Sequence, residues 1–245
     1  MLRRMLFRIL SVVGILAIVV FCFKNTTWSI LLAPSEYDFT TYQMIECITS
    51  CIGINFKFEE FHIDLIATDL SSQFMTHITT SVYLALLGAS PYIIYELFRF
   101  ISPALYESEK KYSVLVVSMI YLLFILGILM SYFVIFPISF RFLGTYSVAE
   151  KIHSTITLDS YIETFTSLTF VMGIVFQLPL IMFVLAKMGF ISYSMLAKYR
   201  KHALIIIMIV AAIITPPDLM TLILVTIPLY LLYEISVRVT KHIHG

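Results

Sequence analysis

Charged side chains are scarce in this sequence, and none lies in the middle of its long apolar runs. Only 13% of the 245 residues are charged, whereas 60% are hydrophobic. A soluble domain has about 25% charged and roughly 45 to 50% apolar residues, so lipid is the expected solvent. The net charge is only +1, which argues against a nucleic-acid partner.

Catalytic and metal-binding patterns are also missing. The sequence contains no HExxH, GxSxG or Walker motif, and its six histidines are scattered around loops and ends. The three cysteines form neither a disulfide framework nor a zinc pattern. Cys47 and Cys51 lie four residues apart in a polar segment, where a bridge is possible only on a non-cytoplasmic face. We therefore expect no enzyme, metal site or cofactor.

Six apolar runs predict an all-α integral membrane protein in which residues 1–245 form a single domain. A bilayer core about 30 Å thick needs roughly 20 apolar residues per helix. Runs near this length occupy residues 9–23, 74–97, 112–140, 161–186, 202–214 and 219–237. The first run resembles a signal peptide, but Lys24 and Asn25 follow it where a cleavage site needs small residues, so we interpret it as an uncleaved span.

The last two of these helices are expected to be short. The fifth run covers only about 20 Å at 1.5 Å per residue and ends before Pro216 and Pro217, and Pro228 interrupts the sixth. We expect a hairpin that thins the bilayer or packs against longer neighbours. A re-entrant pair is the alternative.

Basic residues predict that both termini are cytoplasmic, because short cytoplasmic loops are rich in lysine and arginine. With the N-terminus inside, 12 of the 16 basic residues fall on that face: Arg3, Arg4, Arg8, Arg99, Lys110, Lys111, Lys187, Lys198, Arg200, Lys201, Arg238 and Lys241. The opposite face receives 11 of the 15 acids. Residues 24–73 form the only long external segment, and their apolar content predicts a cap folded on the helices.

Gln177 is the one strongly polar side chain deep in the fourth run. Pro179 removes a backbone donor two residues later, so Gln177 either satisfies a freed carbonyl or a neighbouring helix, or forms a polar spot that contacts a partner or cargo. Glu96 and Glu234 lie near cytoplasmic ends, where we expect water to be close. The lack of a central titratable relay disfavours the alternative function of an ion-coupled small-solute transporter.

The loop at residues 102–111 places two carboxylates on a face dominated by cations. Glu107 and Glu109 either pair with nearby lysines, at no more than about 1 kcal/mol for each exposed pair, or form an anionic site for a basic ligand. The residue pattern alone leaves both interpretations open.

Eight short motifs in this order resemble the TatC family, the receptor subunit of the twin-arginine protein translocase. They are Ile66-Ala67-Thr68-Asp69, Ala89-Ser90-Pro91-Tyr92, Ser102-Pro103-Ala104-Leu105-Tyr106 with Glu109, Ser131-Tyr132-Phe133-Val134-Ile135-Phe136-Pro137, Phe176-Gln177-Leu178-Pro179, Lys198-Tyr199-Arg200, Thr215-Pro216-Pro217-Asp218 and Ile227-Pro228-Leu229-Tyr230. The resemblance covers nearly the whole chain, and the family's six spans with two short last helices match the run lengths.

The resemblance implies a receptor that binds twin-arginine signal peptides of folded precursors at the cytoplasmic face. It further implies TatA and TatB partners, a homo-oligomer within the receptor complex and transport driven by the proton-motive force. The expected location is a bacterial inner membrane, and organellar membranes also host the family.

The same resemblance assigns candidate site residues. Glu109 takes the place of the loop carboxylate that pairs with a signal-peptide arginine, with Glu107 assisting. Gln177 stands where relatives have Glu or Gln, and Thr215 and Asp218 flank the turn where single-span partners dock; plain turn chemistry is the alternative for Asp218.

The N-terminus departs from the family pattern, in which His-Leu-x-Glu-Leu-Arg adds a glutamate to the recognition patch. Here Arg3 falls on the motif's arginine and Met1 on its glutamate. The two explanations are a start internal to a longer reading frame, which we favour, and a true loss of half the patch.

Overall fold

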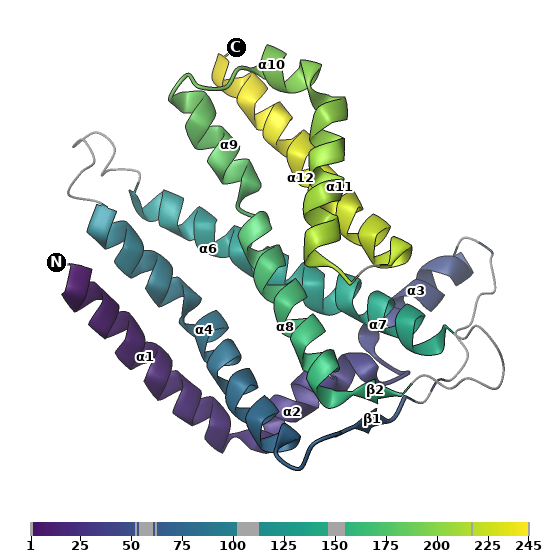
Figure 1. Ribbon diagram of the computed structural model, residues 1–245. Helices are drawn as coiled ribbons and strands as arrows, with labels where there is room; N and C mark the ends of the chain where they lie inside the picture. Colours follow the sequence, from purple (N-terminus) through teal and green to yellow (C-terminus); the bar gives the residue numbers. More distant parts are fainter. Residues whose placement is uncertain are drawn as a thin grey trace.

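The computed structural model describes residues 2–51, 53, 61, 63–101, 113–146, 155–216 and 218–244. Helices dominate this part of the chain, and both termini lie at the end of the bundle away from β1 (Leu65–Ile66) and β2 (Ile156–Thr157) (Figure 1). The two strands pair in parallel, with Leu65 opposite Ile156. The pair therefore joins the segment between the first two spans to the segment before the fourth span.

The first two spans lie side by side as α1 (Leu2–Cys22) and α4 (Ser72–Ile101) (Figure 1). After three arginines in its first two turns, α1 is almost entirely apolar, and only Met5 is buried within the described chain, as expected for a helix with lipid on most sides. At the strand end of α4, the hydroxyls of Ser72 and Thr76 donate to the carboxylate of Asp159. This contact ties the start of α4 to the start of the fourth span.

The third span is α6 (Ser113–Met130), the π-helical segment η3 (Ser131–Ile135) and α7 (Phe136–Thr145). It crosses the fourth span at Gly127, where an added Cβ would lie 2.5 Å from the carbonyl oxygen of Met172 and 2.9 Å from Cα of Gly173. Because a side chain would not fit there, glycine lets the two helices approach closely.

The fourth span is broken into α8 (Leu158–Val175) and α9 (Leu178–Lys187). Pro179 lies in the first turn of α9, where its missing N–H is tolerated. The amide N–H of Gln177 bonds to Ile174 O instead of reaching Gly173 O. The proline expected to disturb this helix thus divides it at Phe176 and Gln177.

The chain ends with α10 (Tyr193–Lys198), α11 (Arg200–Ile214) and α12 (Leu219–His244). Among the residues that the structure describes, five helical spans are long and apolar enough to cross a membrane, and α11, with 15 residues, is too short to be among them. The prediction of a short last helix is wrong, because α12 has 26 residues. The helix continues through Pro228. It also extends beyond the apolar run, because the polar residues that follow Val237 are compatible with a helix.

The segment between the first two spans contains α2 (Lys24–Leu32), the 3-10 turn η1 (Ala33–Ser35) and α3 (Thr40–Cys51), and it contacts the spans through buried hydrogen bonds. Pro137 cannot donate to Phe133 O, and the hydroxyl of Thr41 donates to that carbonyl instead. Tyr42 Oη donates to Pro137 O at 2.8 Å, and Tyr161 Oη to Leu31 O at 2.7 Å.

Burial raises the pKa of Tyr42, with the nearby Arg141 guanidinium acting weakly in the opposite direction. The phenol therefore stays neutral at ordinary pH and remains a donor.

Candidate functional site

The end of the bundle that carries the termini is where the sequence predicts recognition. Glu107 and Glu109 lie outside the described residues, between the end of α4 at Ile101 and the start of α6 at Ser113. Arg3 is exposed in the first turn of α1, and this end of α1 lies beside the end of α4 (Figure 1). The chain thus brings Arg3 to the end of the bundle from which the acidic loop leaves.

Glu96 is buried at this end, contrary to the expectation that water would be close. Its side chain is only 3% exposed, and its Oε1 lies 3.1 Å from Nη1 of Arg8 and 3.9 Å from Nη1 of Arg99. Tyr92 Oη also donates to Oε1, at 3.3 Å. A buried carboxylate is tolerated when it is paired in this way. The carboxylate of Glu96 is therefore already engaged by side chains of the same chain.

Sequence reasoning missed the pair between Arg8 and Glu96, which lie 88 residues apart. A signal was available, because a lone acid in an apolar helix needs a cation at the same depth, and Arg8 is the last basic residue before the first apolar run. The analogous pair links Arg200 Nε to Glu234 Oε1 at 2.9 Å and fixes α11 against α12.

A surface hollow of about 630 Å³ lies against the N-terminal turns of α1. Arg3, Arg4, Phe7 and Arg8 line it. Arg8 is paired with Glu96, but Arg3 and Arg4 have no acidic partner among the described residues, and their charges repel a cationic peptide unless anions lie nearby. Recognition of arginine at this end therefore requires carboxylates from outside these turns.

Gln177 bonds to the neighbouring third span. Its Nε2 donates to Ile120 O of α6 at 3.0 Å and to Gly173 O at 3.5 Å. Gly173 O is the carbonyl that lost its helical donor at the break between α8 and α9. The side chain of Gln177 thus both satisfies a freed carbonyl and bonds to a neighbouring helix, the two structural roles considered from the sequence. Its buried Oε1 has no partner among the described residues.

An apolar hollow of about 360 Å³ lies in the middle of the bundle, between α1, α2, α4, α6 and α8. The residues that line it are Val19, Val20, Phe23, Thr26, Thr27, Ile30, Leu31, Leu84, Leu87, Ile128, Tyr132, Phe165 and Thr169. None of these described residues carries a charge, so the hollow suits an apolar side chain or helix and excludes an ion.

The turn between α11 and α12 is held by local hydrogen bonds. Asp218 Oδ1 accepts the N–H of Thr221 at 2.7 Å and caps α12, and the hydroxyl of Thr215 donates to Ala211 O at 3.0 Å. The second carboxylate oxygen of Asp218 is buried without a partner among the described residues. Capping explains the aspartate here, and one oxygen remains for a further donor.

Beside this turn, α11 presents an apolar face that the described chain does not cover. Ile206, Ile209 and Ile213 are 60%, 55% and 80% exposed. A helix of 15 residues spans about 22 Å, less than an average hydrocarbon core. Its apolar surface therefore faces lipid or another apolar helix.

Comparison with known proteins gives consistent matches. The family model described as "Sec-independent protein translocase protein (TatC)" matches residues 1–228. The TatC protein of Blattabacterium sp. subsp. Periplaneta americana is 34% identical over 224 residues, which are 90% of this chain and 84% of that protein. The TatC protein of Desulforapulum autotrophicum is 33% identical over 236 residues, which are 96% of this chain and 80% of that protein.

Among solved structures, the crystal structure of a twin-arginine translocase receptor, TatC, superposes with a TM-score of 0.75. The two sequences are 31% identical, and the superposition covers 100% of this chain and 98% of the chain in the crystal structure. A second crystal structure of such a receptor, in the detergent DDM, superposes with a TM-score of 0.76.

Proposed function

Because the chain belongs to the TatC family of Sec-independent protein translocase proteins, we propose that it is the signal-peptide receptor and core subunit of a twin-arginine translocase. It would bind precursors that are already folded and pass them across the membrane. The observation that carries this proposal is the likeness to a translocase receptor over the whole chain, in sequence and in fold. The absence of a nucleotide-binding motif in the sequence is consistent with transport driven by the proton-motive force.

The carboxylates of Glu109 and Glu107 would recognise the arginines of the signal peptide. Carboxylates accept two parallel hydrogen bonds from a guanidinium, which gives both charge and geometry for the pair. Glu96 is the one buried acid at this end among the described residues, and Arg8 and Arg99 already occupy it. Arg3, exposed at the same end, would help to orient the two loop carboxylates.

The apolar part of the signal peptide would lie in the hollow lined by Val20, Leu84 and Phe165. A peptide whose charges stay at the recognition end can enter the bundle only with an apolar segment, because burial of charge in hydrocarbon is costly.

The partners would be the single-span proteins TatA and TatB. The exposed isoleucines of α11 and the turn with Thr215 and Asp218 offer an apolar face ending in one unpaired carboxylate oxygen. Gln177 would add a polar contact within the membrane. The receptor would be a homo-oligomer in a bacterial inner membrane, or in an organellar membrane.

Replacing Glu109 with Gln tests the recognition site. We expect the variant to keep its helices and to lose photocrosslinking to a twin-arginine precursor from a probe at position 105, which leaves Glu107 in place. The matched control is Glu163→Gln, an exposed acid on α8, which should leave crosslinking unchanged. Undiminished export and crosslinking in Glu109→Gln would contradict the site, and solute uptake by the chain alone in liposomes would favour a transporter.

A further inference from the structure

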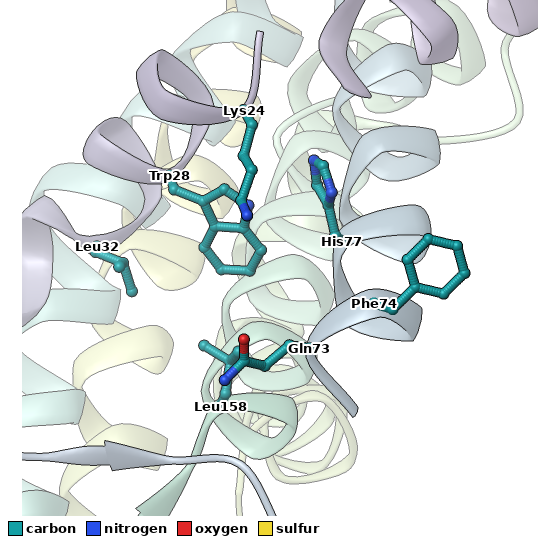
Figure 2. A pocket seen from close by; sticks show the side chains of 7 residues that line it. All are labelled: Lys24, Trp28, Leu32, Gln73, Phe74, His77 and Leu158. Atoms are coloured by element: carbon teal, nitrogen blue, oxygen red, sulfur yellow. The ribbon is translucent and has the colours of Figure 1, made fainter. Parts of the chain in front are cut away.

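A partly open cavity of about 370 Å³ lies between α2, the first turns of α4 and the start of α8. Figure 2 shows Lys24 and Trp28 of α2 facing His77 of α4, with the amide of Gln73 near Leu158. The cavity is at the end of the bundle opposite the termini (Figure 1). It is therefore separate from the proposed recognition loop and from the turn after α11.

His77 is held firmly in this cavity, yet one of its nitrogen atoms has no partner. Its imidazole stacks on the ring of Phe21, with 4.2 Å between centroids and 15° between planes, and the ring of Trp28 lies 6.2 Å away. The residue is only 8% exposed, and Nε2 has no hydrogen-bond partner among the described residues. Because an unpaired buried polar atom is unfavourable, the site is incomplete without a hydrogen-bonding ligand.

Lys24 gives the cavity a positive charge. No described acidic residue pairs with it, and none of the described lining residues is acidic. Asp159, which follows the lining residue Leu158, is already engaged by the hydroxyls of Ser72 and Thr76. A lysine ammonium beside neutral hydrogen-bonding groups favours an anion, and lysine binds phosphate as a compact point charge.

The surroundings of the cavity indicate a ligand that comes from the membrane. Phe74, in the first turns of α4, also lines the cavity and is 58% exposed (Figure 2). Leu32 and Leu158 make one part of the wall apolar. Tryptophan and lysine at the ends of spans lie at headgroup depth, and basic pockets between helices bind lipid headgroups.

We propose that this cavity binds the phosphate group of an anionic glycerophospholipid from the leaflet at this end of the bundle. The ammonium of Lys24 pairs with the phosphate, and His77 Nε2–H and the amide of Gln73 donate to its oxygens. The indole of Trp28 and the leucines contact the glycerol and the upper acyl chain. The proposal rests on the cavity alone and is independent of signal-peptide binding.

Native mass spectrometry of the full chain released from detergent tests this site. The probe is phosphatidylglycerol, compared with a diacylglycerol that has the same acyl chains but no phosphate. We expect Lys24→Gln and His77→Phe each to lower phosphatidylglycerol retention by about tenfold or more, as the loss of a charge-assisted or buried hydrogen bond predicts. His77→Phe keeps a ring against Phe21, and Lys24 is exposed, so both variants should fold, which size-exclusion chromatography checks.

Lys201→Gln, which removes an exposed charge from α11, is the matched control and should retain the lipid like the original chain. Three results would overturn the proposal. The first is that the Lys24 and His77 variants retain as much phosphatidylglycerol as the original chain. The second is that the original chain retains diacylglycerol as well as phosphatidylglycerol. The third is that it binds free glycerol 3-phosphate as tightly as the lipid.

Discussion

Arg8 Nη1 lies 3.1 Å from Glu96 Oε1, and this ion pair joins α1 to α4 near the end of the bundle that carries the N-terminus. Replacing Arg8 with Gln leaves the buried carboxylate with the more distant Arg99 as its one described cationic partner, besides the hydroxyl of Tyr92. Breaking a fully buried pair costs about 3 to 5 kcal/mol. Because Arg8 is 45% exposed, we expect a smaller loss of about 1 to 3 kcal/mol in the free energy of unfolding.

Thermal unfolding in detergent, followed by circular dichroism, measures this loss. The double variant Arg8→Gln with Glu96→Gln should recover part of it, because no buried charge then remains unpaired. Arg4→Gln is the control, since Arg4 is exposed and forms no ion pair with the described residues. A stability loss in Arg4→Gln as large as in Arg8→Gln would show that the pair is not the cause.

Gln177→Leu removes the donor to Ile120 O and Gly173 O. We expect a loss of about 1 to 3 kcal/mol, because two carbonyls lose a partner in the bundle. Gln43→Ala, which removes an exposed hydrogen bond to Asp38 O, should have a much smaller effect in the same unfolding measurement. If Gln177→Leu keeps its stability but loses cargo, the amide serves binding and not the packing of α6 on α8 and α9.

Gly127→Ala should push α6 away from α8, because the new methyl group would overlap Met172 O and Gly173 Cα. Overpacking of this kind costs about 1 to 3 kcal/mol. Gly88→Ala on α4 is the matched control, since a Cβ there meets no atom within 4 Å, and it should be neutral or slightly stabilising. Equal melting temperatures for the two variants would contradict the close crossing.

Two variants of Asp218 distinguish its role in capping α12 from a role in partner binding. Asp218→Ala removes the cap of α12 and should cost about 1 kcal/mol of stability. Asp218→Asn retains a side-chain oxygen for Thr221 N–H and should unfold like the original chain. If the free carboxylate oxygen binds a partner, Asp218→Asn will still lose copurification with single-span subunits; retained copurification would limit Asp218 to capping.

The sequence by itself determined the membrane class and the helical spans. Apolar run length is a local property, and a helix in lipid satisfies its own backbone, so α1 and α4 follow from composition alone. Local proline chemistry also indicated that the fourth helix is disturbed near Gln177. The same rule failed at Pro228, where α12 continues, because a proline can be tolerated within a membrane helix.

The tertiary structure alone decided which distant groups meet. Arg8 pairs with Glu96, Gln177 bonds to Ile120 O, and Thr41 takes the carbonyl that Pro137 leaves free. These partners are 57 to 92 residues apart, and no periodicity of the chain encodes their contact. Helix packing brings them together because a buried polar group must find a partner in a bundle that excludes water.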